Sequence, residues 1–309
     1  MTEFDTVLIV LAATLRAGTP LVFAALGELV TERSGVLNLG LEGMMLSGAV
    51  VGFIVAVNGG GVVLGFVAAM LAGVILSLIF GYLTLTLRAS QVPTGLALTI
   101  FGIGLSAFLG LNYRDKVIDG VHPLDVKGLS DIPVLGQLLF AHDPLVYLSI
   151  ALFIGVSWFL YRSHAGLVLR GVGESHDIAH AIGYRVIRIR YMAVAFGGAM
   201  SGLAGGYLSL AYTPMWADNM TAGRGWIALA LVVFATWRPG RVMLGAYLFG
   251  GVTILQLHLQ GAGFAISPQL LSTLPYLATI VVLVIISRDA TKIRRNAPGA
   301  LGKAFYPGR

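Results

Sequence analysis

Uninterrupted apolar stretches dominate the chain. No Asp, Glu, Lys or Arg occurs in residues 43–87, 89–113, 191–217 or 242–287. A helix needs about 20 apolar residues to cross the hydrocarbon core of a membrane, so the first and last stretches are each long enough for two crossings. Each is interrupted near its middle by a polar, glycine-containing segment, NGGG and QGAG. The pattern predicts helices that cross a membrane.

We predict an all-α fold, a polytopic membrane helix bundle of about nine spans with some broken helices. One transmembrane domain would occupy residues 1–309, with a polar segment at 163–190 and a basic tail at 288–309. The predicted spans are 6–30, 36–57, 62–87, 93–112, 144–162, 191–212, 223–237, 242–258 and 269–287.

Three segments are expected to break their helices: 16–20, 90–99 and 213–226. Unwound backbone at membrane depth is tolerated only beside protein or a water-filled cavity. We therefore expect the transport path near these segments.

The composition agrees with a membrane protein. Hydrophobic residues make up 57% of the chain and charged residues 11%, with a mean hydropathy of +0.87, whereas soluble domains carry about 25% charged residues. The absence of Cys excludes disulfides and thiol chemistry and makes most metal sites improbable. We expect no cofactor, no metal and no nucleic-acid partner.

The distribution of cations predicts the orientation. Lys and Arg accumulate in the cytoplasmic connections of membrane proteins. Fifteen of them fall on one side, in the turns at Arg33, at Arg88 and at 238–241, in residues 162–190 and in the tail. The connection at 113–143 holds only three, against five Asp. We place the N-terminus outside and the C-terminus in the cytoplasm.

Two carboxylates, Glu28 and Glu42, lie inside predicted spans, one or two turns from their ends. An ionised carboxylate there costs several kcal/mol unless it is paired or faces a polar cavity. Two interpretations remain open. The carboxylates either pair at the interface with Arg33 or with a neighbouring subunit, or they belong to the transport path.

Segment 163–190 contains a short helical pattern, GESHDIAHAIGY, surrounded by arginines. A short helix parallel to the membrane could transmit motion from a soluble partner. Alternatively, it is an amphipathic connector that binds anionic lipid. His176 and His180 have the i, i+4 spacing of a metal pair, but a solvated helix face is the simpler interpretation because no third ligand is nearby.

The same segment resembles the coupling loop of ABC importer permeases, although Asp177 and Ile178 replace the usual Glu and Ala. Residues 20–49, 169–210 and 222–251 resemble blocks of the simple-sugar and nucleoside branch of this class, and the resemblance covers nearly the whole chain. It implies that the coupling residues are Gly173, Glu174, Asp177, Ile178, Ala179 and Gly183.

The resemblance implies a permease subunit of a binding-protein-dependent ABC importer in a bacterial inner membrane. Its partners would be a paralogous permease in a heterodimer, an ABC ATPase with two nucleotide-binding halves and an extracytoplasmic substrate-binding lipoprotein. The chain lacks a G-x-x-x-x-G-K-[ST] phosphate loop. We therefore expect no enzymatic activity here, with ATP hydrolysis on the partner ATPase.

The resemblance also favours purine nucleosides or related neutral solutes, moved by alternating access. The central spans offer hydroxyl, amide and aromatic groups rather than the cation cluster that an anionic substrate would need. The predicted pathway residues are Asn38, Glu42, Thr94, Thr99, Asp218, Asn219 and Arg224.

Two alternative classes of function remain. An ion-coupled secondary transporter would use Arg16, Glu28 and Glu42 for proton or sodium coupling and would need no ATPase. A membrane enzyme would need a convergent catalytic cluster, which the sequence does not show.

Overall fold

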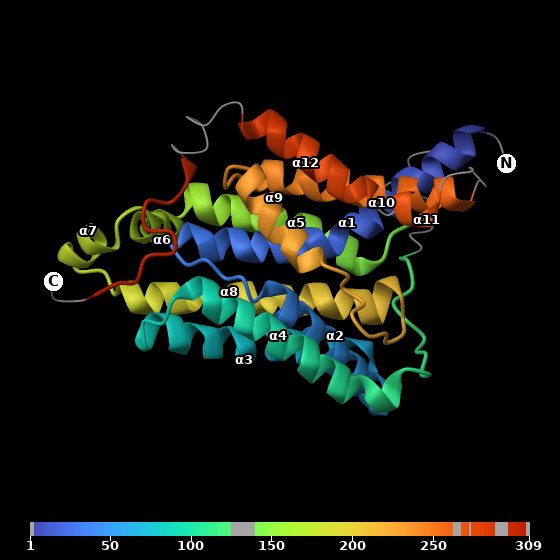
Figure 1. Ribbon diagram of the computed structural model, residues 1–309, viewed down its shortest axis with the longest axis horizontal. Helices are drawn as coiled ribbons and strands as arrows, with labels where there is room; N and C mark the ends of the chain where they lie inside the picture. Colours follow the sequence, from blue (N-terminus) through green and yellow to red (C-terminus); the bar gives the residue numbers. More distant parts are fainter. Residues whose placement is uncertain (1–2, 125–139, 262–266, 272, 288–295, 307–309) are drawn as a thin grey trace.

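The computed structural model describes residues 3–124, 140–261, 267–271, 273–287 and 296–306. These residues are almost entirely helical (Figure 1). The one extended pairing among them is an isolated bridge between Val117 and Met215. The all-α prediction is therefore confirmed.

Most helices run along the long axis of the bundle. Helices α6 and α7 and the last described residues lie at one end, called the α7 end (Figure 1). The other end, called the loop end, holds the N-terminus and residues 111–124. The helices are α1 Glu3–Arg33, α2 Leu41–Val55, α3 Gly61–Gly81, α4 Gln91–Gly110, α5 Pro144–Arg162, α6 His164–Glu174, α7 His176–Ala181, α8 Val186–Tyr207, α9 Arg224–Phe234, α10 Pro239–Gly261, α11 Pro268–Leu271 and α12 Leu274–Ser287.

The predicted count of about nine spans is not confirmed. Six stretches of the described residues are long and apolar enough to cross a membrane: Val7–Arg33, Leu41–Thr86, Gln91–Tyr113, Pro144–Arg162, Val186–Tyr212 and Pro239–Gly261. The predicted span 223–237 is wrong as a crossing because α9 has only 11 residues. At 1.5 Å per residue it extends about 17 Å, roughly half of the hydrocarbon core.

The predicted break at 58–61 is confirmed. The 46-residue stretch Leu41–Thr86 holds two helices, α2 and α3, joined at Ala56–Gly60. Asn58 and Gly59 leave the helical conformation, and Gly61 has a φ of 72°. The corresponding break at 260–263 falls where α10 ends at Gly261, and residues 262 and 263 lie outside the described part of the chain.

The predicted break at 16–20 is wrong, since α1 continues through Pro20. Proline removes one backbone donor, but membrane helices tolerate it where neighbouring groups satisfy the freed carbonyls. The carbonyl that Pro20 frees is that of Arg16, and in the same turn the Thr19 hydroxyl donates to the neighbouring Leu15 carbonyl at 2.8 Å. The surrounding chain is buried, which holds the helix together.

The prediction for 90–99 is also wrong in detail. The chain leaves helical structure before Gln91, and α4 then begins there and runs without a break. Pro93 lies in the first turn of α4, where the missing N–H costs nothing because the first amides of a helix have no partner within it. Segment 213–226 is different: residues 213–223 are non-helical, as predicted.

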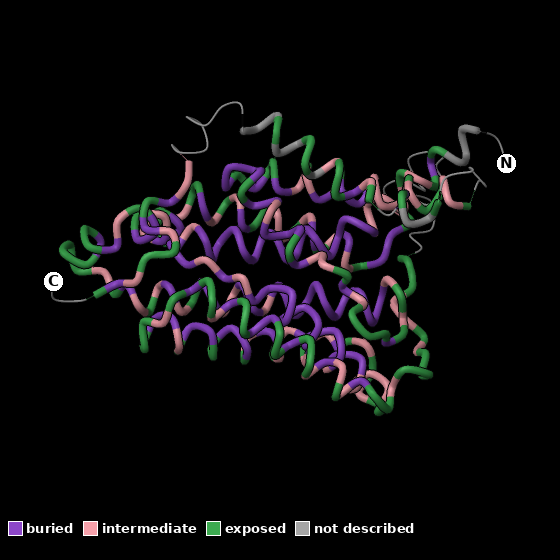
Figure 2. The backbone as a smooth tube through the Cα atoms, viewed as in Figure 1, coloured by how far each residue is buried: buried purple, intermediate pink, exposed green. Residues whose placement is uncertain are grey.

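Helix α8 forms the centre of the bundle and packs against α1, α2 and α3. Buried residues follow its length, whereas exposed residues collect on the outer helices (Figure 2). A side chain at Gly205 would overlap the Met45 carbonyl of α2, and one at Gly202 would overlap the Ala69 carbonyl of α3. Small residues at these contacts allow the close backbone packing by which helices associate in lipid.

Candidate functional site: a buried carboxylate where two half helices meet

Helix α2 begins inside the bundle rather than at its α7 end (Figure 1). Residues 34–40 lead from the end of α1 into the interior. The Leu39 carbonyl there accepts a hydrogen bond from Thr99 at 2.8 Å. Thr99 is the ninth residue of α4, about 12 Å along that helix. The start of α2 is therefore more than two helical turns deep.

Helix α9 also begins inside the bundle, but the chain reaches it from the other end. The N–H of Ile118, in the connection at the loop end, donates to the Pro214 carbonyl at 3.1 Å. Residues 213–223 then run inward to the start of α9 (Figure 1). Trp237, three residues after α9, donates to Glu32 at 2.5 Å and accepts from Arg33 at 2.7 Å. Helix α9 therefore crosses only the half of the bundle nearer the α7 end.

The two half helices meet at the Glu42 carboxylate, in the first turn of α2. It accepts the Thr221 hydroxyl at 2.5 Å, the Gly223 N–H at 2.9 Å and the Gly225 N–H at 2.6 Å. Its residue is only 2% exposed. Two of these donors are amides at the N-terminus of α9, where helix amides lack partners and the helix dipole favours a negative charge.

Helix α9 has no cap of its own, because Gly223 occupies the N-cap position with a φ of 80° and provides no side-chain acceptor. Glu42 fills that role from another helix. The approach is close enough to require glycine at the next contact: a Cβ at Gly225 would lie 2.6 Å from Glu42 Oε2 and 2.7 Å from its Cα. The hydrogen bonds to the carboxylate and the close approach at Gly225 thus hold the start of α9 against α2.

Neighbouring polar groups shape the turn before α2. The Asn38 side chain accepts the Gly40 N–H at 2.9 Å, and the backbone N–H of Asn38 donates to Glu28 at 3.1 Å. Glu28 is fully buried, and its second oxygen has no hydrogen-bond partner among the described residues. Glu28, in α1, therefore faces the turn before α2 inside the subunit and does not lie at a subunit edge. Arg224 turns back to the Met220 carbonyl at 3.1 Å.

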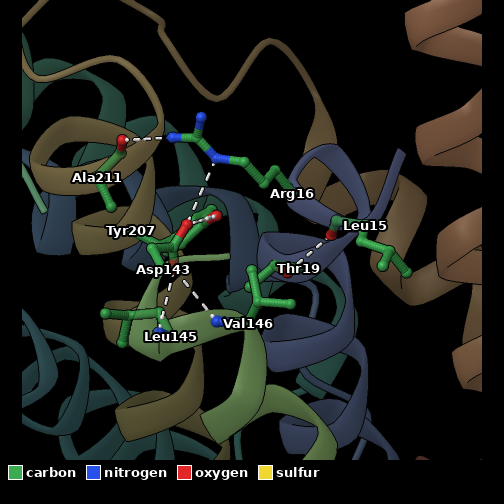
Figure 3. Close-up of polar contacts among 8 residues, drawn as sticks. All are labelled: Leu15, Arg16, Thr19, Asp143, Leu145, Val146, Tyr207 and Ala211. Atoms are coloured by element: carbon green, nitrogen blue, oxygen red, sulfur yellow. Dashed lines mark hydrogen bonds and ion pairs between the residues drawn. The ribbon is translucent and has the colours of Figure 1, made fainter. Parts of the chain in front are cut away.

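Arg16, the other cation inside a predicted span, is paired with Asp143 (Figure 3). Its Nε lies 3.4 Å from Asp143 Oδ2, and its Nη2 donates to the Ala211 carbonyl at 3.2 Å. Asp143 also accepts the Tyr207 hydroxyl at 2.9 Å and caps α5 through two backbone amides. This cluster joins α1, α5 and α8 close to the loop end.

The structure brings together four of the seven predicted pathway residues. Asn38, Glu42, Thr99 and Arg224 surround the starts of the two half helices. Thr94 lies apart, in a groove formed by α3 and α4.

Asp218 and Asn219 are also apart from Glu42. Both are exposed in the connection before α9, and Asp218 pairs with Arg114 at 2.5 Å. Sequence reasoning missed Thr221 and Gly225 as partners of Glu42. The sequence did contain one indication of this contact. The helix start at TAGRG has no capping side chain of its own, so an acceptor from elsewhere in the chain was needed.

At the α7 end, the structure contains the expected short helix, and its coupling role stays a prediction. Helix α7 is six residues long, and Gly183 follows it with a φ of 95°, a conformation that glycine adopts without strain. Asp177 and Ile178 are exposed and Ala179 is buried. Gly173 and Glu174 belong to the preceding helix α6, and Gly173 is buried against the Arg33 carbonyl.

The last described residues, 296–306, pack under this helix. Phe305 contacts the rings of His176 and His180, each at 5.3 Å between centroids. Arg190 donates to the Lys303 carbonyl at 3.2 Å and lies 3.1 Å from His176 Nδ1. Burial, and then the Arg190 charge, lower the pKa of His176. A neutral His176 therefore accepts from Arg190, so it is not free to join a metal pair.

A bundle of apolar helices in which two half helices meet at membrane depth is an arrangement that transporters use. The chain belongs to the permease family described as "Branched-chain amino acid transport system / permease component", whose profile matches residues 10–286. It is a permease subunit of an ABC importer and a multi-pass membrane protein. The family implies an ATPase and a substrate-binding protein as partners, and it identifies the chain as a transport component rather than an enzyme.

Similarity to individual relatives extends over nearly the whole chain. It is 40% identical to a Haloferax volcanii protein provisionally named as a glucose ABC transporter permease, TsgC13, over 96% of each chain. It is 33% identical to the Bacillus subtilis guanosine ABC transporter permease NupQ, over 97% of each chain. It is 30% identical to the Lactococcus lactis nucleoside ABC transporter permease NupC, over 92% of this chain and 94% of that one.

Proposed function

We propose that this permease imports purine nucleosides or related neutral solutes by alternating access, as one half of a heterodimer with a paralogous permease. A partner ATPase would bind at α7 and drive the cycle, and an extracytoplasmic lipoprotein would deliver the substrate. The observation that carries the proposal is the near full-length similarity to permeases named for guanosine and nucleosides.

The polar groups at the half helices support a neutral substrate. Glu42 is occupied by α9, and the Arg224 guanidinium is directed at backbone carbonyls. A strongly anionic solute would need a cluster of free cations near mid-membrane, and the described residues around Glu42 provide none beyond Arg224. The Thr94 hydroxyl, in the groove formed by α3 and α4, suits weak hydrogen bonding to a passing solute.

A sugar is the second candidate. The relative named for glucose is 40% identical, a higher identity than either relative named for a nucleoside. A nucleoside contains a sugar, so both solutes present hydroxyl groups without charge. The two candidates differ in whether the path must accept a planar base.

We propose that the α7 end faces the cytoplasm, which places the C-terminal tail there. The fifteen Lys and Arg residues counted in the sequence support this orientation. An exposed coupling helix must face the compartment that holds ATP. Ile178 in α7 is 66% exposed, and Ile182, directly after the helix, is 69% exposed.

Uptake in cells that express the whole importer tests the substrate. Labelled guanosine or adenosine is offered, with unlabelled nucleosides, free sugars or amino acids as competitors. We expect competition from nucleosides alone. If only a free sugar or an amino acid competes, the nucleoside assignment fails while the permease assignment stands. A matched strain that lacks the ATPase provides the background.

A further inference from the structure

A polar pocket of about 580 Å³ opens at the α7 end. It lies among the end of α1, the last turns of α5, helix α6 and the start of α10. Its charged and aromatic lining includes Arg33, Tyr161, Arg170, Glu174, Arg238 and Arg241. Neither half helix contributes to it, so it is separate from the Glu42 site.

Positive charge dominates this pocket, with four arginines and one carboxylate. Arg33 donates to two neutral carbonyls, those of Trp237 and Asn296, and Arg241 donates to the Thr236 hydroxyl at 2.8 Å. No ion pair joins any of the four guanidinium groups to a carboxylate in the described part of the chain. The pocket therefore holds charge that a bound anion could balance.

One guanidinium atom is left without a partner. The Nε of Arg170 is buried and makes no hydrogen bond in the described structure, while the same side chain stacks on Tyr161, 5.3 Å from the ring centroid. A buried donor without an acceptor is costly. The Arg170 guanidinium is therefore held by the Tyr161 ring and not by an acceptor, and it brings its positive charge to the pocket wall.

The start of α10 adds to the positive potential. Pro239 and Gly240 open this 23-residue helix at the pocket wall, and helix N-termini favour negative charge. Guanidinium groups match the geometry of phosphate oxygens.

The pocket also lies where a membrane surface would be. The neighbouring face of α5 is apolar and exposed, with Ile154 at 60% and Trp158 at 62%. Tyr161, one turn further along, is 46% exposed and lines the pocket. Tyr and Trp favour the interface between headgroups and acyl chains. A basic pocket between helices at that level is suited to an acidic headgroup.

We propose that this pocket binds a phosphate group, supplied by an anionic phospholipid whose acyl chains lie along α5. A free phosphate would satisfy the same guanidinium groups, so the two sources must be separated by experiment.

Gly240→Glu tests the site without removing an arginine. A Cβ at Gly240 meets nothing within 4 Å, so a glutamate there has room and adds a negative charge to the pocket wall, where it would compete with a phosphate. An acidic residue near the start of α10 should not destabilise that helix. Gly240→Gln controls for side-chain size. Gly171→Glu, on α6 at the same end and also in open space, controls for added charge.

The measurement is native mass spectrometry of the purified chain with added phosphatidylglycerol or phosphatidylcholine. We expect the wild type, Gly240→Gln and Gly171→Glu to retain phosphatidylglycerol selectively, and Gly240→Glu to retain it at least about tenfold less. Equal retention by Gly240→Glu and Gly240→Gln would overturn the proposal. So would equal retention of the two lipids by the wild type.

Millimolar inorganic phosphate separates the two sources. Persistent retention of phosphatidylglycerol in its presence supports a lipid ligand. Displacement of the lipid by phosphate, in the wild type and in Gly171→Glu alike, supports a phosphate site filled from solution.

Discussion

At the residue scale, the buried Glu42 carboxylate holds the start of one helix against another. It has three donors within 2.9 Å, two of which are amides of α9. Hydrogen bonds from backbone amides to a carboxylate are shorter and stronger than bonds between neutral groups. Of the two interpretations open for Glu42 in the sequence, the structure supports pairing, but with a helix terminus instead of an arginine.

Gly225→Ala tests this contact. The added methyl would lie 2.6 Å from Glu42 Oε2 and 2.7 Å from its backbone, so α9 must move away from α2. Overpacking of this kind costs about 1–3 kcal/mol. We expect a lower thermal unfolding temperature in detergent and a marked loss of uptake by the complete importer.

Gly104→Ala is the matched control, because a Cβ there meets nothing within 4 Å and the residue lies within α4. Alanine is favoured over glycine inside a helix by about 0.5–1 kcal/mol. The control should therefore unfold at the wild-type temperature or slightly above it. Equal stability of Gly225→Ala and Gly104→Ala would contradict the close contact.

What the sequence could show at this scale was the presence of Glu42, because an ionisable residue inside an apolar stretch is conspicuous. Its partners were not visible. Thr221 and Gly225 are about 180 residues away in the chain, and no local pattern reports a contact of that range.

At the scale of elements, helix lengths were harder to predict than helix positions. Apolar content alone made 223–237 look like a crossing, whereas α9 is a half helix that begins at Arg224. The chain before it is non-helical because Asn219, Ala222 and Gly223 have positive φ values. Conversely, Pro20 suggested a break that packing suppresses. Tertiary contacts decide both outcomes, so a linear pattern could not.

The short helix α7 carries a prediction at this scale. Its Ile178 side chain is 66% exposed. Exposure of an apolar side chain to water is unfavourable, so a partner that covers Ile178 would bind more tightly. We expect Ile178→Glu to leave the permease folded and to weaken its binding to the partner ATPase. Losing a buried apolar anchor from an interface typically costs over about 1 kcal/mol.

Affinity purification of the ATPase with the tagged permease measures that binding. Leu124→Glu is the control, because Leu124 is a 44% exposed leucine at the loop end. It should retain the ATPase fully. If Ile178→Glu retains as much ATPase as the control, the proposed coupling role of residues 173–183 is wrong.

At the scale of the whole molecule, three of the seven proposed pathway residues are packed out of reach of a solute. Asn38, Glu42 and Thr99 are between 0% and 3% exposed, and they bond to backbone or to α9 rather than facing a lumen. The path that the half helices serve is therefore expected at the surface of the subunit. A single copy would provide only one wall of it.

This arrangement predicts that the chain does not transport alone. The complete path should need the paralogous permease, so co-expression should allow a tag on either permease to purify both from mild detergent. Vesicles with this chain alone should show no uptake of labelled nucleoside, whereas vesicles with both permeases, the ATPase and the binding lipoprotein should accumulate it when ATP is supplied. Uptake by the isolated chain, driven by a proton or sodium gradient, would contradict the need for a second permease. It would favour the ion-coupled mechanism that Arg16, Glu28 and Glu42 first suggested.

The Arg16–Asp143 pair allows folding to be tested separately from assembly, because that cluster joins α1 and α5 within one subunit. Asp143→Asn disrupts the pair and should lower the stability of the subunit. It should not change which partner permease co-purifies with the chain.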